Sequence, residues 1–346
     1  MNKLFGHACS VGVLFQLITL YANRRQIMMN LLFLLLGVGL LTIGGEALIR
    51  GSLAASQRLG VSPLLSGLVI VGFGTSAPEL VVSVNAALNQ QPDIAIGNVV
   101  GSNIGNVLLI LGICALIAPL TIKPLALRRD AVTVVAASIL FLVLVGGSAL
   151  GRADGVIFLI ALVAYLVWAY WSERIHAPAA TLNKAEAEEL TALPKSLGWT
   201  VAAVVIGLLL LISGSQVLLI GAVGIAESLG VSEAVIGLTL VAVGTSLPEL
   251  SISVIAALRR HADVAVGNIL GSNIFNLLGI LGVSALLQPL PVHARILQFD
   301  QWVLLVASLL LFLFLYTGRC LSRLEGGILL ATYGVYVSLS FTTFGG

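Results

Sequence analysis

The 346-residue sequence has little charge: Asp, Glu, Lys and Arg together make up only 9% of it, and the formal net charge is +2. Soluble domains carry about 25% charged residues, so an ordinary soluble enzyme is excluded. Nucleic-acid binding is excluded as well, because there is no excess of positive charge to neutralise phosphates. Cysteine is also scarce. Cys9, Cys114 and Cys320 lie far apart, without metal-ligand spacing or the density of a disulfide scaffold.

The sequence is rich in apolar residues instead. Hydrophobic residues make up 59% of the chain, and its 37 glycines are suited to close helix packing in lipid. A bilayer core requires roughly 20 apolar residues per helix. We therefore predict an all-α polytopic membrane protein with ten transmembrane helices, at 30–50, 61–87, 93–118, 131–149, 153–171, 197–224, 231–257, 263–288, 301–318 and 324–343.

The predicted spans divide into two sets of five. We expect a first five-helix repeat at 30–171, a charged linker at 172–196 and a second five-helix repeat at 197–346. Residues 1–29 form an N-terminal extension of open status. The alternatives are a signal-like segment, an extra helix, the product of an upstream start codon or a poorly ordered extension, and we favour the last two.

Basic residues in the joints predict the orientation. One side of the membrane receives Arg50, Arg58, Lys123, Arg128, Arg129, Arg174, Lys184, Lys195, Arg259, Arg260, Arg319 and Arg323. The other side receives Arg152 and Arg295. Because Lys and Arg accumulate on the cytoplasmic side, the linker is expected in the cytoplasm, with residue 30 and the C-terminus outside the plasma (cell inner) membrane.

Two polar motifs occur twice, 170 residues apart. GTSAPEL at 74–80 returns as GTSLPEL at 244–250, and GNVVGSNIGN at 97–106 returns as GNILGSNIFN at 267–276. Since each half has an odd number of predicted spans, the second half enters the membrane from the opposite face. Many secondary transporters are built from such inverted repeats, and their binding sites lie at the membrane midplane on interrupted helices.

Each half carries one glutamate in the middle of an apolar span, Glu79 and Glu249. A charged carboxylate at that depth costs several kcal/mol unless it is paired. No Lys or Arg lies near their depth in the same spans, so the missing partner is a cation or a proton. The plainer alternative is a protonated glutamate that packs two helices together, but it does not explain the repeated Thr, Ser and Pro.

The residues beside each glutamate offer further oxygen atoms. Thr75 and Ser76 share a helical face with Glu79, and Pro78 leaves the Gly74 carbonyl without its helical donor. Unpaired carbonyls at membrane depth are tolerated where they line a cavity. The second motif repeats these features with Thr245, Ser246 and Pro248.

The second pair of motifs places Ser102 with Asn106, and Ser272 with Asn276, on single helical faces. His and Cys are absent from the combined set, and oxygen ligands suit Ca²⁺ and Na⁺ rather than Zn²⁺ or Cu²⁺.

Other polar groups receive structural assignments. We expect Glu46 to pair with Arg50 one helical turn away. The remaining motif amides are expected to form hydrogen bonds between helices; they are Asn98, Asn103, Asn268 and Asn273.

The doubled GTSxPE and GNxxGSNxxN motifs resemble those of the Ca²⁺/cation antiporter superfamily, most closely the prokaryotic sodium/calcium exchangers. The resemblance implies ten helices in two inverted halves, a transporter rather than an enzyme, and spans 1 and 6 that slide to alternate access. It implies Ca²⁺ and Na⁺ as transported substrates, with no cofactor and no obligate protein partner. The implied Ca²⁺ ligands are Glu79, Glu249 and the carbonyls of Thr75 and Thr245. Sodium sites would add Ser76, Ser102, Ser246, Ser272 and the carbonyls of Gly72 and Ala242, and Asn106 and Asn276 would complete a central position.

The sequence leaves alternatives open. Some family members have Asp at the position of Asn276, so one possible charge is missing here. Ca²⁺/H⁺ exchange on the same fold is the nearest alternative, although Gly101 and Gly271 stand where proton-coupled relatives tend to carry an acidic residue. A cation channel is a more distant one.

Overall fold

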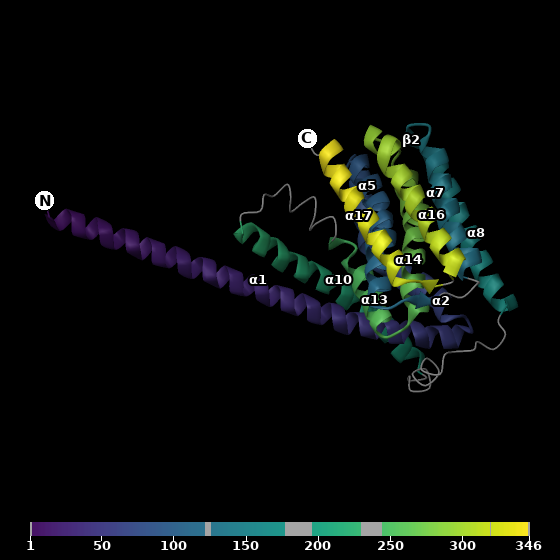
Figure 1. Ribbon diagram of the computed structural model, residues 1–346, viewed down its shortest axis with the longest axis horizontal. Helices are drawn as coiled ribbons and strands as arrows, with labels where there is room; N and C mark the ends of the chain where they lie inside the picture. The colour runs from purple at the N-terminus through teal and green to yellow at the C-terminus, as the bar shows by residue number, and fades with distance from the viewer. Residues whose placement is uncertain (1, 122–125, 177–195, 230–243, 319, 345–346) are drawn as a thin grey trace.

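The computed structural model describes residues 2–121, 126–176, 196–229, 244–318 and 320–344. These residues form a bundle of helices with two short pairs of strands (Figure 1). The expected sodium ligand Ala242, most of the predicted linker and the first part of the span at 231–257 lie outside the described residues.

Helices dominate both halves because both consist of long apolar runs. The first half contains α1 (Asn2–Leu59), α2 (Pro63–Ser66), η1 (Gly67–Gly72), α3 (Phe73–Thr75), α4 (Ala77–Leu88), α5 (Pro92–Gly105), η2 (Asn106–Ile110), α6 (Leu111–Ile117), β1 (Leu120–Thr121), η3 (Ala126–Ala131), α7 (Val132–Val145), β2 (Ala149–Leu150) and α8 (Arg152–His176). The second half contains α10 (Leu197–Ser228), α13 (Leu247–Leu258), α14 (Ala262–Ile274), η5 (Phe275–Ile280), α15 (Leu281–Leu287), β3 (Leu290–Pro291), η6 (Ile296–Asp300), α16 (Gln301–Gly318), β4 (Cys320–Leu321) and α17 (Arg323–Phe344).

Six of the described helices are long and apolar enough to cross a membrane, and a seventh span is formed if the bent segment from Pro63 to Leu88 is counted. The predicted class, a helical membrane protein, agrees with this finding. The first predicted span belongs to a much longer helix, because α1 begins at Asn2 and residues 2–29 continue it. The first residues assigned to the linker, 172–176, belong to α8.

The helices α1 and α10 lie alongside each other at a steep angle to the rest of the bundle, and α1 extends far beyond it (Figure 1). Glycines recur every seven residues along both helices, at 37, 44 and 51 and at 207, 214 and 221. A Cβ atom added at Gly44 would lie 2.9 Å from the Gly207 carbonyl oxygen, and one at Gly214 would lie 3.2 Å from that of Gly37. The contacts run in opposite directions along the two chains, so α1 and α10 are antiparallel with backbones in close contact.

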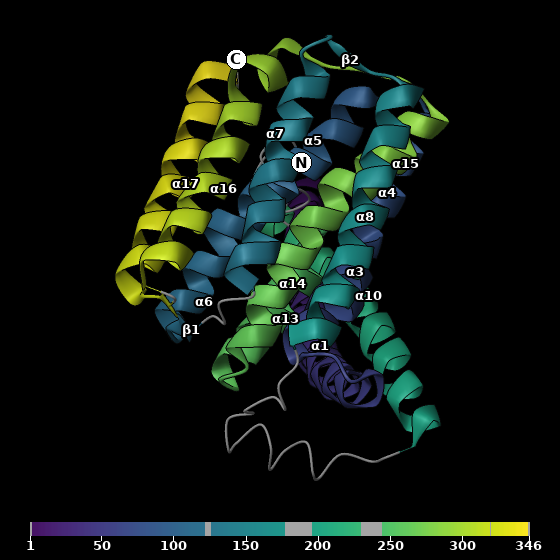
Figure 2. The same ribbon diagram turned by 90° about the vertical axis from the view of Figure 1, so that its right-hand side faces the viewer.

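The second half repeats the element order of the first, and the short strands pair between the two halves. Strand β1 pairs with β4, and β2 pairs with β3, so each strand pairs with one from the other half. The hydroxyls of Ser138 and Ser308, which are equivalent residues, lie 2.9 Å apart in contact with each other. Strand pairing of this kind is expected when two copies of a unit are related by a two-fold rotation. Equivalent residues of the two copies then contact each other only at the rotation axis. Figure 2 shows α16 and α17 on one flank of the bundle and α8 on the other.

Candidate functional site

The two repeated GTSxPE motifs lie where helices break. Helix α3 ends at Thr75, α4 begins at Ala77, and the segments meet at Ser76 with a bend of 45°. Ser246 occupies the same place before α13. Proline in the first turn of each new helix explains the break, because it has no N–H to continue the preceding turn. Glu79 and Glu249 consequently lie in the first turns of α4 and α13, where the helix dipole favours a negative charge.

Each glutamate is contacted by the serine of the opposite motif. Ser76 Oγ donates to Glu249 Oε1 at 3.0 Å, and Ser246 Oγ donates to Glu79 Oε1 at 3.2 Å. The sequence predicted that Ser76 and Glu79 share a helical face. The structure instead joins the two motifs into one site between the halves.

Several polar atoms of the predicted ligand residues are buried and have no hydrogen-bond partner among the described residues. Glu79 is 1% exposed and Glu249 is 0% exposed, yet the Oε2 atom of each has no such partner. The same holds for Asn106 Oδ1, for both side-chain polar atoms of Asn276 and for Thr245 Oγ1. A buried polar atom without a partner is costly, and a buried charge is more so. The set consists largely of oxygen atoms, which suits a hard cation such as Ca²⁺ or Na⁺.

Amide side chains hold the broken helices in place. Asn98 Nδ2 donates to the Glu79 carbonyl at 3.2 Å and to Ser83 Oγ at 2.9 Å. Its equivalent, Asn268 Nδ2, makes the same bonds to the Glu249 carbonyl at 3.2 Å and to a second serine at 2.8 Å. The predicted helix-to-helix role of Asn98 and Asn268 is therefore confirmed.

The other two amides behave differently from each other. Asn273 links the halves, since it donates to the Asn103 carbonyl at 3.4 Å and accepts from Asn106 Nδ2 at 3.0 Å. Asn103 Nδ2 donates to the Val99 carbonyl of its own helix instead, at 2.7 Å. The predicted interhelical hydrogen bond therefore fits Asn273, whereas the amide of Asn103 bonds within its own helix.

Some expected cation ligands are already engaged by protein groups. The Gly72 carbonyl accepts hydrogen bonds from Ser272 Oγ at 3.1 Å, from Thr75 Oγ1 at 3.3 Å and from the Ser76 N–H at 3.2 Å. Thr75 Oγ1 also donates to Asn268 Oδ1 at 3.1 Å. The Gly74 carbonyl, expected to be unpaired, is approached by the Ser76 N–H. In this arrangement the carbonyl oxygens of Gly72 on η1 and Gly74 on α3 are therefore engaged by hydrogen-bond donors of the protein itself.

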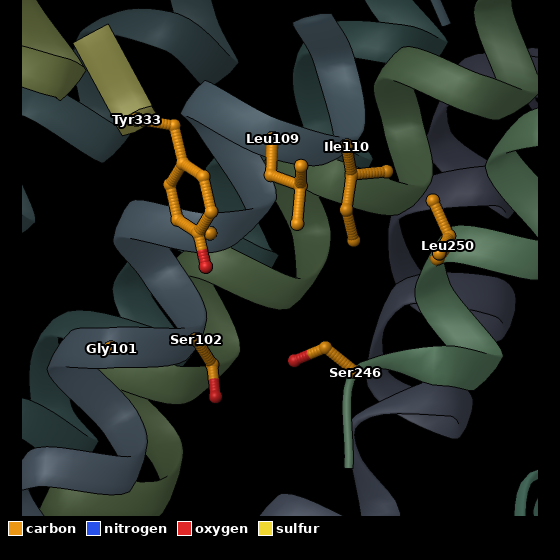
Figure 3. A pocket seen from close by; sticks show the side chains of 8 residues that line it. Gly101, Ser102, Leu109, Ile110, Ser246, Leu250 and Tyr333 are labelled. Carbon is orange, nitrogen blue, oxygen red and sulfur yellow. The ribbon is translucent and has the colours of Figure 1, made fainter. Parts of the chain in front are cut away.

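A small cavity of about 40 Å³ opens beside the site, between α5, η2, α13 and α17. Its wall includes Ser102, Ser246, Gly101 and Tyr333. Figure 3 shows the Ser246 hydroxyl pointing across the cavity toward α5, and the Tyr333 hydroxyl pointing toward Ser102. A space of this size admits a few water molecules or a partly hydrated cation. The sequence did not single out Tyr333, whose only signal was a tyrosine in the middle of an apolar span.

A buried ion cluster fixes the start of the first broken helix, and the sequence reasoning missed it. Arg129 pairs with Asp130 and with Glu173 at 3.2 Å. The Glu173 carboxylate accepts both the Ser62 N–H at 3.2 Å and the Ser62 hydroxyl at 3.0 Å, while Tyr165 donates to Asp130 at 2.8 Å. Because Ser62 caps α2, the cluster joins α2 to η3 and α8. An adjacent Arg and Asp at the start of a span was the available signal.

Fold and site together are those of a helical membrane protein with a buried, oxygen-rich site between two related halves. A family model described as "Sodium/calcium exchanger protein" matches residues 29–171 and, separately, residues 199–342. The chain therefore belongs to the sodium/calcium exchanger family, which consists of membrane antiporters, and the family expected from the motifs is confirmed.

Individual relatives agree over nearly the whole chain. "Putative antiporter CaxA" of Alkalimonas amylolytica is 38% identical over 320 residues, covering 90% of this chain and 98% of the relative. "Sodium/calcium exchanger MaX1" of Methanosarcina acetivorans is 32% identical, covering 91% and 99%. A solved structure of the sodium-calcium exchanger NCX_Mj, soaked with 2.5 mM Na⁺ and 10 mM Sr²⁺, aligns with a TM-score of 0.77 and 32% identity over 90% of this chain and 99% of that one.

Proposed function

We propose that this protein is a secondary active antiporter that exchanges Na⁺ for Ca²⁺ by alternating access and normally extrudes Ca²⁺. The observation that carries this proposal is the pair of buried carboxylates, Glu79 and Glu249, each with an oxygen that has no partner among the described residues. Two carboxylates neutralise one Ca²⁺ or are shared among several Na⁺. Competition for the same pair of side chains is sufficient to link the two ion fluxes.

The proposed architecture is ten transmembrane helices in two inverted repeats of five. Three observations support it: the antiparallel packing of α1 on α10, the exchanged strand pairs, and a family model that matches each half separately. The spans beyond the six or seven long apolar helices would be the shorter or interrupted ones, as in transporters whose sites lie at helix breaks.

The proposed ligand set is shared between the halves. Ca²⁺ would be held by Glu79, Glu249 and the carbonyls of Thr75 and Thr245. Na⁺ would also use Ser76, Ser102, Ser246, Ser272, Asn106, Asn276 and the carbonyls of Gly72 and Ala242. Use of the Gly72 carbonyl by Na⁺ requires the Ser272 hydroxyl to turn away from it, because that hydroxyl now donates to it.

The proposed setting is the plasma (cell inner) membrane, with the central linker in the cytoplasm and the C-terminus outside. The positive-inside rule supports this orientation. Ca²⁺ and Na⁺ are the transported substrates, the lipid bilayer is the surrounding partner, and we propose neither a cofactor nor an obligate protein partner.

The decisive experiment is ⁴⁵Ca uptake into Na⁺-loaded vesicles that contain the purified protein. Uptake should require the outward Na⁺ gradient and should stop when an ionophore collapses it. Uptake driven by a pH gradient without Na⁺ would favour Ca²⁺/H⁺ exchange instead. Steady single-channel currents would favour a cation channel.

A further inference from the structure

The α1–α10 pair contacts the helices that carry the ion site at several points, and one of these contacts is an ion pair. Helix α1 approaches α13 at Gly45, where an added Cβ would lie 2.5 Å from Ile255 Cδ1. At the next residue of α1, Glu46 Oε2 lies 3.0 Å from Arg259 Nη2. Arg259 caps the C-terminal end of α13.

Helix α13 connects this ion pair to the ion site. It has 12 residues, with Glu249 in its first turn and Arg259 directly after its last residue. A short regular helix moves as a rigid element. A tether at Arg259, at the C-terminal end of α13, therefore also restrains Glu249 at its N-terminal end. The local pair expected from the sequence is also present, since Glu46 Oε1 lies 2.8 Å from Arg50. Glu46 therefore bridges an arginine of its own helix and one of α13.

The equivalent positions of the other half carry no charge. Gln216 stands where Glu46 would be, and Asn89 stands where Arg259 would be. Gln216 is exposed, and Asn89 Nδ2 donates to the carbonyl and to Oδ1 of Asn85, at 2.9 Å each. Uncharged amides cannot replace an ion pair, so this tether between the halves has no counterpart at the equivalent pair of positions.

We propose that the Glu46–Arg259 ion pair is a conformational latch that holds the α1–α10 pair against α13 and opens when the two move relative to each other. The inference rests on the proposed function, because alternating access supplies the movement. Since the equivalent pair of positions, Gln216 and Asn89, forms no such latch, the Glu46–Arg259 pair biases the two access states unequally. Arg259 is 53% and Glu46 24% exposed. Half-exposed pairs shift an equilibrium only about two- to five-fold, which suits a latch that must open in every cycle.

Distance measurements between spin labels test the latch without measuring transport. Leu59 at the end of α1 and Leu258 at the end of α13 are both exposed and suit labelling as cysteines, after the native cysteines are replaced. We expect Glu46→Gln and Arg259→Asn, which copy the other half, to enlarge a second distance population about two- to five-fold. The double variant should do no more than either single variant, because both remove the same pair. Arg50→Gln, which removes the local pair alone, should leave the parent distribution unchanged.

Ionic strength supplies an independent readout, because exposed ion pairs are screened by salt. Choline chloride at high concentration should shift the parent toward the Glu46→Gln distribution and should leave that variant unchanged. Unaltered distances in both single variants, or a shift of equal size in Arg50→Gln, would overturn the latch. Loss of Na⁺-dependent ⁴⁵Ca flux in the unmodified protein would instead count against the proposed function, so the two failures are distinguishable.

Discussion

The glycine-bearing helices of the two halves, α5 and α14, have nearly the same motif and different surroundings. On α14, a Cβ added at Gly271 would lie 2.1 Å from the Leu68 carbonyl oxygen, and one at Gly267 would lie 2.7 Å from that of Leu64. On α5, a Cβ at Gly101 or Gly105 would meet no described atom within 4 Å. Gly101 and Gly105 line the cavity beside the ion site.

The serines that follow these glycines show the same contrast. Ser272 on α14 donates to the Gly72 carbonyl across the interface between the halves, whereas Ser102 on α5 donates to the Asn98 carbonyl of its own helix at 2.6 Å. One motif therefore supports two environments: a face sealed by the backbone of η1, and a face beside a cavity. An alternating-access transporter needs both environments and exchanges them between its halves. The comparison predicts which substitutions should have unequal effects in the two halves.

The largest effect is expected where the halves should behave alike. Glu79→Gln and Glu249→Gln should each lower Ca²⁺ transport by about 10- to 150-fold, because a charge-assisted ligand bond is worth about 1.5–3 kcal/mol and each variant removes one of the two charges. ⁴⁵Ca flux in Na⁺-loaded vesicles measures this loss. Glutamine keeps the shape of the side chain, so both variants should insert and fold.

Thermal unfolding provides the control for the glutamate variants. Without ions, each variant should unfold at or above the parent temperature, because a buried charge without a partner has been removed. Near-normal exchange in either variant would contradict the site.

The next prediction concerns the glycines that differ in surroundings. Gly271→Ala should destabilise the protein by about 1–3 kcal/mol, because η1 must move away from α14 to accommodate the methyl group. Gly101→Ala at the equivalent position should cost much less. Thermal unfolding of the purified variants compares the two directly. Equal destabilisation would mean that both faces are sealed to the same degree in solution.

The sequence foretold the break in each helix and the burial of each glutamate, because proline and a lone charge in an apolar run have local physical consequences. It could not predict that Ser76 contacts Glu249 rather than Glu79, since this depends on how the halves meet in space. Nor could it reveal that Gly271 is sealed while Gly101 is open. Closely similar local sequences acquire that difference from the position of η1, which tertiary packing decides.

The equivalent serines should separate stability from ion affinity. Ser272→Ala removes a hydrogen bond between the halves, so it should lower stability by about 1 kcal/mol. Ser102→Ala removes a bond within one helix and should leave stability nearly unchanged, while raising the Na⁺ concentration needed for half-maximal exchange. Thermal unfolding and Na⁺ titration of ⁴⁵Ca flux check the two effects. A Ser102 variant with the parent Na⁺ dependence would remove that serine from the sodium ligands.

The smallest effect is expected at the central amides. Asn276 has no hydrogen-bond partner among the described residues, whereas Asn106 donates to Asn273. Asn276→Asp should therefore fold normally and add a charge that is present only when the new carboxyl group is ionised. At low pH the neutral acid resembles the parent amide, so exchange should match the parent. As pH rises, the carboxylate should strengthen Ca²⁺ binding a few-fold, in keeping with ordinary charge–charge interactions.

Asn106→Asp replaces a donor by an acceptor facing the Asn273 oxygen, so it should instead weaken function as pH rises. The pH dependence of Ca²⁺ half-saturation in vesicles measures both variants, and parallel profiles would show that the two central amides share one environment.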